Sequence, residues 1–146
     1  MKYLIPIFLL SFTFSNAQTD TRLYDIINAV SAERLEKDVS MLVGFGTRHT
    51  LSDTISTTRG IGAARRWIKQ EFEVISKDCN NCLEVFFQKD LVKEGTNARI
   101  PFDVEVVNVV AIQRGTKFPN RFIIMSGDID SRVTDPNDYT SNSPGA

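Results

Sequence analysis

The sequence has few of the residues that most often reveal a function. Its 146 residues include two cysteines and one histidine, and the 17 basic side chains do not outnumber the 18 acidic ones. Without a basic excess to release counterions, the chain is not expected to bind nucleic acid through bulk charge. No stretch reaches the roughly 18 consecutive apolar residues that a membrane span needs, so no stable span is expected. A zinc ribbon is excluded because it needs a second pair of cysteines.

What is present is ordinary globular composition, with 42% hydrophobic and 24% charged residues at a net charge of −1. A chain this apolar and this close to neutral is not expected to be disordered. Its length allows at most one domain of common size. Residues 141–146 (SNSPGA) form a turn-rich ending with no closing helix or strand, which suggests a fragment.

The first 17 residues have the order of a secretory signal peptide. A positive start at Lys2 precedes an almost wholly apolar stretch, residues 3–14, and small residues at Ser15 and Ala17 define a cleavage site. The alternative, an amphipathic or buried N-terminal helix, is disfavoured by Pro6. We therefore expect cleavage after Ala17 and a secreted or periplasmic protein in an oxidising environment. Residues 18–146 would then form the domain.

The two cysteines, Cys79 and Cys82, are separated by two asparagines. A thioredoxin-type site would place the first cysteine at a helix N-terminus after a strand. Here the pair follows a helical pattern and precedes a strand pattern. In an exported protein the pair is therefore a candidate disulfide that fixes a helix-to-strand turn.

Helical periodicity predicts two helices. Ser31 is a good N-cap for the first, whose apolar face is Leu35, Val39 and Leu42 and which ends near Gly44. The second is expected to start near residue 57 or 58, and its buried stripe recurs at helical spacing. The members of that stripe are Ile61, Ala64, Ile68, Phe72 and Ile75.

Strand periodicity follows the cysteines. Residues 83–87 alternate as a half-buried strand, and a second strand over residues 102–111 changes phase at Val106 and Val107, which indicates a bulge or a twist. The continuous apolar run of residues 122–125 (FIIM) predicts a central strand buried on both faces. The fold class expected is α/β, a mixed β-sheet flanked by helices and incomplete at the C-terminus.

Two carboxylates follow the last predicted strand. Asp128 and Asp130 lie two residues apart, so on an extended chain they point the same way. Two carboxylates on one face need a divalent cation, a positive side chain such as Arg132, or a shared proton. The bland alternative is a solvated acidic turn. His49, the only histidine, is either a metal ligand or a hydrogen-bonding loop residue. Residues 135–138 (DPND) do not fit a calcium loop, so a plain acidic turn is expected there.

From about Ile27 onward the chain resembles the N-terminal half of secreted zinc-dependent aminopeptidases, the co-catalytic di-zinc exopeptidases. Three stretches carry the resemblance: residues 44–50 (GFGTRHT) leading to 60–64 (GIGAA), residues 107–112 (VNVVAI), and residues 122–132 (FIIMSGDIDSR) running to 143–146 (SPGA). The family's usual form in the third stretch is a strand, Gly-His-x-Asp-Ser, and a loop to Pro-Gly-Ala.

The resemblance implies a role for each carboxylate. Asp128 stands where the family has its first metal-binding histidine, a departure that leaves a metal ligand but changes its charge. Asp130 matches the family's aspartate and would support the catalytic site electrostatically. The bridging aspartate, the glutamates and the last histidine would follow Ala146, so the fragment alone is expected to be inactive. The implied cofactor is zinc, two ions in the full-length protein.

The implied function is an exported metallopeptidase, an aminopeptidase that hydrolyses peptide or protein substrates through a metal-activated water. Two alternatives keep the same scaffold. A non-catalytic binding domain is favoured by the change from histidine to Asp128, and a glutaminyl-cyclase-like acyl transferase would use one zinc ion.

Overall fold

The structure is a computed structural model that describes residues 20–145. The signal peptide expected over residues 1–17 lies outside this part. The described residues belong to two units, one ending at Ala32 and the other starting at Glu33. None of the helices in the described part is long and apolar enough to cross a membrane.

The first unit contains helix α1, Thr21–Asn28. Its N-cap is Asp20, whose carboxylate accepts a hydrogen bond from the backbone N–H of Arg22 at 3.0 Å. The apolar side chains of Ile26 and Ile27 are 66% and 64% exposed. The helix is therefore held locally by its cap rather than by a core.

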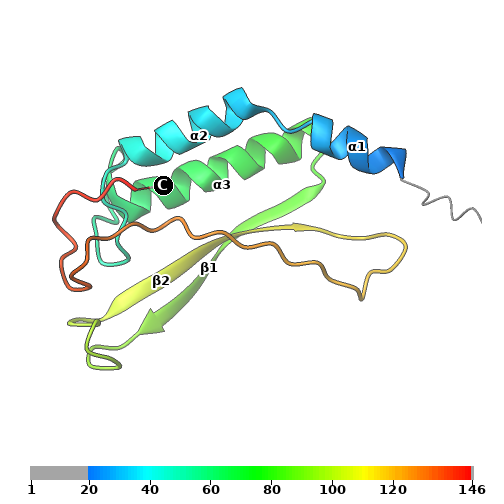
Figure 1. Ribbon diagram of the computed structural model, residues 1–146. Coiled ribbons are helices and arrows are strands. Elements are labelled where there is room, and N and C mark those ends of the chain that lie inside the picture. The colour runs from blue at the N-terminus through cyan, green and yellow to red at the C-terminus, as the bar shows by residue number, and fades with distance from the viewer. Residues whose placement is uncertain (1–19, 146) are drawn as a thin grey trace, which may run out of the picture. The chain divides into compact units, whose positions relative to one another are not determined.

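Two helices of the second unit run side by side, α2 (Ala32–Gly44) and α3 (Gly60–Asp78) (Figure 1). Both predicted helices are confirmed, and α2 ends at the expected glycine. An ion pair joins them at 2.5 Å, from Arg34 to Glu71. The predicted apolar face of α2 is only partly buried, since Leu35 and Val39 remain 55% and 48% exposed.

The core of this unit lies where α2 ends and α3 begins. Phe45, Ala63 and Ala64 are buried there, and Leu42 and Trp67 pack against them. The rings of Phe45 and Trp67 have centroids 6.1 Å apart. The predicted stripe on α3 is fully buried at its start and half exposed at Ile75, so the core fades toward the end of the helix.

Helix α3 starts at Gly60, two or three residues later than predicted. The N–H groups of its first residues are bonded by the preceding loop: Gly60 donates to the Phe45 carbonyl at 2.9 Å, Ile61 to the Ser52 hydroxyl at 3.0 Å, and Gly62 to a carbonyl at 3.1 Å. These are the donors that a helix start leaves without partners. The loop that satisfies them, not the sequence around residue 57, therefore sets where the helix begins.

The sheet in the described part is an antiparallel hairpin of β1 (Leu83–Val92) and β2 (Val104–Gln113), and α3 packs against both strands (Figure 1). Helices with a sheet confirm the α/β class. Of the two predicted explanations for the change of phase, a bulge or a twist, the bulge is wrong, because the register is unbroken: Val106 lies opposite Asp90, and Val107 opposite Lys89. The change of phase reflects which β2 side chains are partly buried, not an extra residue.

The third predicted strand is also wrong. Phe122, Ile123, Ile124 and Met125 have no strand assignment and are 81–94% exposed. A strand exists only where a neighbour completes its hydrogen-bond ladder, and residues 122–125 pair with neither β1 nor β2. The apolar run indicates that this segment could be buried in a sheet, but it does not show that a partner strand is present.

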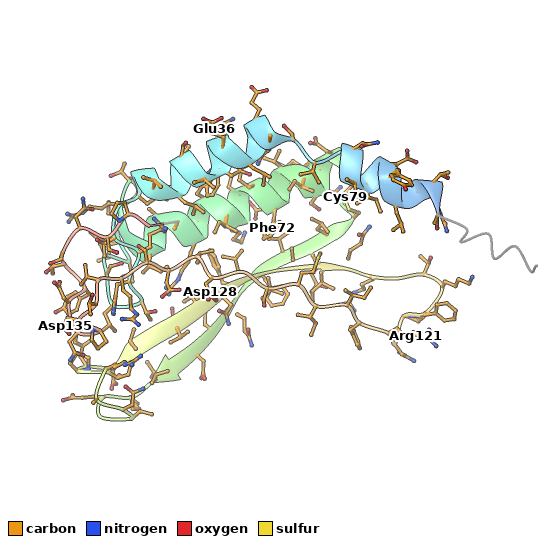
Figure 2. The ribbon with its side chains drawn as sticks, viewed as in Figure 1. Glu36, Phe72, Cys79, Arg121, Asp128 and Asp135 are labelled. Atoms are coloured by element: carbon orange, nitrogen blue, oxygen red, sulfur yellow. A yellow bond between two sulfur atoms is a disulfide. The ribbon has the colours of Figure 1, made fainter. Side chains whose placement is uncertain are left out.

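The turn from α3 into β1 contains the Cys79–Cys82 disulfide, with Cα atoms 5.4 Å apart (Figure 2). Between the cysteines, Asn80 and Asn81 have φ angles of 61° and 60°. Asparagine is one of the few residues other than glycine that adopts this left-handed backbone readily. The two asparagines therefore allow the tight reversal that the disulfide closes.

Candidate functional site

Arg48 is the most buried charged residue of the loop between α2 and α3, with 1% of its surface exposed. Its guanidinium donates to the carbonyl of Leu42 at 2.5 Å, of Gly46 at 3.1 Å and of Ile129 at 2.9 Å. It also donates to the carbonyls of Pro144, at 3.2 Å, and Gly145. Five N–H donors in a rigid planar group suit such a set of acceptors.

These bonds join three segments that are distant in sequence. The backbone N–H of Arg48 donates to the buried hydroxyl of Ser131 at 2.9 Å, which adds a second link to the segment of Ile129. Burial lowers the pKa of Arg48, while the charge of Asp130 raises it. We call this arrangement the Arg48 clasp. It fixes residues 129–131 and 144–145 against the end of α2.

Asp128 and Asp130 lie on the segment that the clasp holds (Figure 2 labels Asp128). Both carboxylates are exposed, whereas Ile129 is half buried and Ser131 is buried. The exposure therefore alternates along the segment, as expected of extended backbone. The structure places the two predicted site residues on the exposed side of the clasp.

The described residues do not form a zinc site by themselves. They contain no group of three or more histidine, cysteine or acidic side chains that could hold a metal ion. A catalytic zinc takes three protein ligands and a structural one takes four. Asp128 and Asp130 are two carboxylates, so a zinc ion bound at them would need ligands from outside this part of the chain.

His49 is a hydrogen-bonding loop residue in this structure. It is 7% exposed, its Nε2 lies 2.9 Å from the carbonyl oxygen of Pro136, and its Nδ1 accepts the backbone N–H of Leu51 at 3.0 Å. Since Nδ1 accepts, Nε2 is the nitrogen that donates to the Pro136 carbonyl. Both nitrogens are occupied, which leaves neither free for a metal.

A second set of contacts holds the segment before Pro144. The hydroxyl of Thr47 donates to the carbonyl of Ser141 and accepts the N–H of Ser143 at 2.7 Å. Asp138 accepts the N–H groups of Ser141, at 2.8 Å, and Thr140, at 3.0 Å. Hydrogen bonds from Ser141 and Thr140 lower the pKa of Asp138 to about 2. The predicted acidic turn is thus a hydrogen-bonded turn, and the chain continues from it into the Arg48 clasp.

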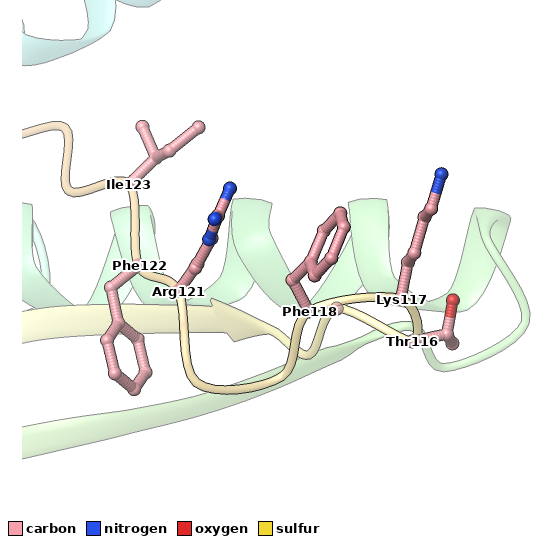
Figure 3. A pocket seen from close by; sticks show the side chains of 7 residues that line it. Thr116, Lys117, Phe118, Arg121, Phe122 and Ile123 are labelled. Atoms are coloured by element: carbon pink, nitrogen blue, oxygen red, sulfur yellow. The ribbon is translucent and has the colours of Figure 1, made fainter.

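The loop after β2 forms a shallow pocket over Phe118 (Figure 3). Lys117 and Arg121 lie 5.5 Å and 4.8 Å from the centroid of that ring. Phe122 and Ile123 point to opposite sides of the chain, as in any extended segment (Figure 3). All of these side chains are exposed, so the pocket has no buried polar group that could orient a ligand.

Sequence reasoning named Asp128 and Asp130 but missed Arg48. An arginine in a glycine-bearing polar loop has the pattern of a surface residue, and charged residues are rarely buried without partners. Three of its partners are backbone carbonyls 81 to 97 residues away. Carbonyl groups occur at every position, so no side-chain pattern could reveal the clasp.

Comparison with known proteins finds relatives that share one description. The chain is 46% identical over 121 residues to a probable zinc metalloprotease of Leptosphaeria maculans, a match covering 83% of this chain and 28% of the relative. A probable zinc metalloprotease of Pyrenophora teres f. teres is 44% identical over 127 residues, with 87% and 26% covered. One from Pyricularia oryzae is 42% identical, with 87% and 25% covered.

The chain is therefore homologous, over most of its length, to proteins named as zinc metalloproteases, and it spans about a quarter of the length of these curated relatives. No family model matches the chain. No solved structure matches it either.

Proposed function

We propose that the protein is an exported zinc-dependent peptidase of the aminopeptidase type, to which residues 18–146 contribute the N-terminal part. The observation that carries the proposal is the similarity to relatives named probable zinc metalloprotease, which covers 83–87% of this chain. The aminopeptidase type rests on the resemblance of residues 122–132 and 143–146 to that family's motif.

The Arg48 clasp gives the motif a physical basis. Its guanidinium binds the carbonyls of Ile129, Pro144 and Gly145, and the backbone N–H of the same Arg48 donates to the hydroxyl of Ser131. The two halves of the motif are therefore neighbours in space. Asp128 and Asp130 face outward from that point, where carboxylates are available to a cation.

The chain's own residues limit what it contributes. The described part has too few ligands for zinc, so the remaining ligands and a general base would come from the rest of the protein. Residues 18–146 alone are therefore expected not to retain zinc on dialysis and not to hydrolyse peptides.

The test uses the protein at the full length of its gene. Zinc content is measured by elemental analysis, and hydrolysis of a leucyl anilide is followed with chelator and after zinc is restored. We expect activity to be lost with the metal and to return with it. Activity that persists after complete metal removal would refute the proposal.

The aminopeptidase type is tested by comparing a peptide with its N-acetylated form. An enzyme that recognises a free amino terminus cleaves the first and spares the second. Equal cleavage of both peptides would identify an endopeptidase instead. Export is tested separately, by N-terminal sequencing of protein recovered outside the cell, which should begin at Gln18.

A non-catalytic binding domain is the second candidate, because Asp128 replaces the family's histidine and the described residues lack a metal-binding group. The Asp128→Val and Asp128→His variants of the full-length protein separate the two. If Asp128 is a ligand, the valine variant loses zinc and activity while the histidine variant keeps both. If neither the parent nor the histidine variant hydrolyses any peptide, the second candidate is supported.

A further inference from the structure

A second pocket lies away from Asp128 and Asp130, between the start of α3 and the β1–β2 hairpin. Its volume is about 390 Å³. One wall is the loop of residues 50–54 with Gly62 of α3, and the opposite wall is the hairpin with Phe102 and Asp103, the residues preceding β2. Arg65 lines this pocket from α3.

Within the described part of the chain, the buried guanidinium of Arg65 lacks a hydrogen-bond acceptor and a paired anion. The residue is 7% exposed, and its Nε is fully buried with no hydrogen-bond acceptor among residues 20–145. Burial lowers the pKa of Arg65, while the charge of Glu105 raises it. A buried donor without an acceptor is costly, and a buried cation without a paired anion more so. A ligand with an anionic oxygen at the guanidinium would supply the missing paired anion.

The neighbouring charges are already engaged. Arg66 donates to the carbonyls of residues 54, 55 and 56. Lys89 pairs with Glu105 at 2.9 Å, and Asp103 pairs with Lys93 at 2.7 Å. Within the described chain, Arg65 is thus the cation of this pocket that has neither an ion pair nor a hydrogen bond.

The charge balance indicates the charge of the missing group. The lining contains three cations (Arg65, Arg66 and Lys89) and two anions (Asp103 and Glu105), which leaves a net charge of +1. Both anions are already paired, Glu105 with Lys89 and Asp103 with Lys93 outside the lining, so a negative charge beside Arg65 supplies the anion that its guanidinium lacks. A carboxylate fits this balance and matches the planar fork of a guanidinium in two parallel hydrogen bonds.

The apolar lining indicates what is attached to the carboxylate. Phe87 and Val107 of the hairpin are half buried in the pocket wall, and Phe102 is 40% exposed beside them. Apolar groups in a wall of this kind favour a ligand with its own apolar surface. Hydroxyl groups of Thr50 and Ser52 on the opposite wall add polar contacts for the same ligand.

We propose that this pocket binds a monocarboxylate with an apolar group beside the charge, and that Arg65 is the residue that holds the carboxylate. The inference does not depend on the proposed peptidase activity, because the pocket lacks Asp128 and Asp130.

The experiment titrates the full-length protein with N-acetyl-L-phenylalanine and with its amide, using calorimetry. The two probes differ in the charge of one group, so the comparison needs no variant. We expect the carboxylate to bind at least about tenfold more tightly, which corresponds to about 1.4 kcal/mol. Equal affinity, absence of binding at millimolar concentrations, or tighter binding of inorganic phosphate would overturn the proposal.

Two variants locate the binding. Arg65→Gln should weaken the carboxylate probe at least about tenfold and leave the amide unchanged. Arg114→Gln is the matched control, because its guanidinium pairs with Glu84 and does not line the pocket, and it should stay within about twofold. Circular dichroism and thermal unfolding check that both variants fold. If Arg65→Gln binds the carboxylate as the parent does, the assignment to Arg65 is wrong.

Discussion

Arg48 shows how one buried side chain can hold separate segments together through backbone carbonyls. Replacing it by methionine keeps most of the volume but removes every donor, so the carbonyls it serves lose their partners. We expect Arg48→Met to lower the free energy of unfolding by about 3 kcal/mol. Arg48→Lys should recover less than half of this loss, because one ammonium cannot reach the same set of acceptors. Urea denaturation measures both.

The control for this loss is Arg114→Met. The side chain of Arg114 is 78% exposed and pairs with Glu84 at 2.7 Å, an exposed ion pair that contributes little. The change in unfolding free energy should stay within about 0.5 kcal/mol. If Arg48→Met costs no more than Arg114→Met, the clasp does not contribute to stability.

Asp138 gives the chain a pH dependence with a defined sign. Its folded pKa of about 2 lies below the ordinary value of 3.8, because Ser141 and Thr140 donate to the carboxylate. Its stabilising contribution is therefore fully present above about pH 4 and is lost as the pH falls through about 2. NMR titration of the Asp138 carboxyl should show a midpoint near 2 in folded protein and near 3.8 in urea. Equal midpoints in both states would contradict the hydrogen-bonded turn.

Some residues of the candidate site could be predicted from the sequence, and the role of others could not. The two carboxylates could be named from their spacing and from the motif, since both are visible in the sequence. The sequence could not decide whether His49 is a metal ligand or a hydrogen-bonding loop residue, because its partner, the carbonyl of Pro136, lies 87 residues away. Long-range contacts of this kind leave no local pattern.

Periodicity in the sequence predicted the helices and strands whose formation depends on local residue patterns. Both helices of the second unit and both strands of the hairpin form where repeats of 3.6 and 2 predicted them, although burial along β2 does not alternate strictly. The start of α3 was placed too early because its first N–H groups bond to the preceding loop, from Phe45 to Asp53. The run from Phe122 to Met125 has the pattern of a buried strand but is exposed. Its local sequence cannot show whether another strand is present to pair with it.

The close approach of that loop to α3 makes Gly62 a sensitive position. Alanine is favoured over glycine inside a helix by about 1 kcal/mol. A Cβ at Gly62, however, would lie 2.2 Å from the carbonyl oxygen of Thr54, a backbone atom that cannot move freely. We expect the steric clash to win, so that Gly62→Ala lowers the free energy of unfolding by about 2 kcal/mol or more. Thermal and urea unfolding measure the change.

Gly44→Ala is the matched control for Gly62→Ala. Gly44 also belongs to a helix, α2, and a Cβ there would meet nothing within 4 Å. Its substitution should be neutral or slightly stabilising. Similar losses at both positions would show that the loop does not press on α3 as the structure has it.

The disulfide closes a very short loop, so its contribution should be small. The chain-entropy model gives about 2 kcal/mol for four residues, and Cys79 and Cys82 are three apart. We expect the Cys79→Ser, Cys82→Ser double variant to remain folded and to lose about that amount in urea denaturation. Complete unfolding of the variant would show that the disulfide is needed for more than the turn.

At the scale of the whole molecule, the largest departure from ordinary burial among residues 20–145 is the run Phe122, Ile123, Ile124 and Met125, which is 81–94% exposed. A contiguous exposed apolar run with extended backbone is a site of association. We expect residues 18–146, expressed alone, to self-associate at about 100 µM in analytical ultracentrifugation, since this surface gains by burial. A single monomeric species at that concentration would contradict this expectation.

Two isoleucines of equal exposure test whether the run is the cause. Ile124 is 88% exposed within the run, and Ile55 is 87% exposed as a single apolar side chain on the loop before α3. Ile124→Lys places a charge inside the associating surface and should shift residues 18–146 toward monomer, whereas Ile55→Lys should not. If both substitutions act equally, net charge rather than the run governs association. If neither acts, the interface lies elsewhere, for example on the half-exposed face of α2 at Leu35 and Val39.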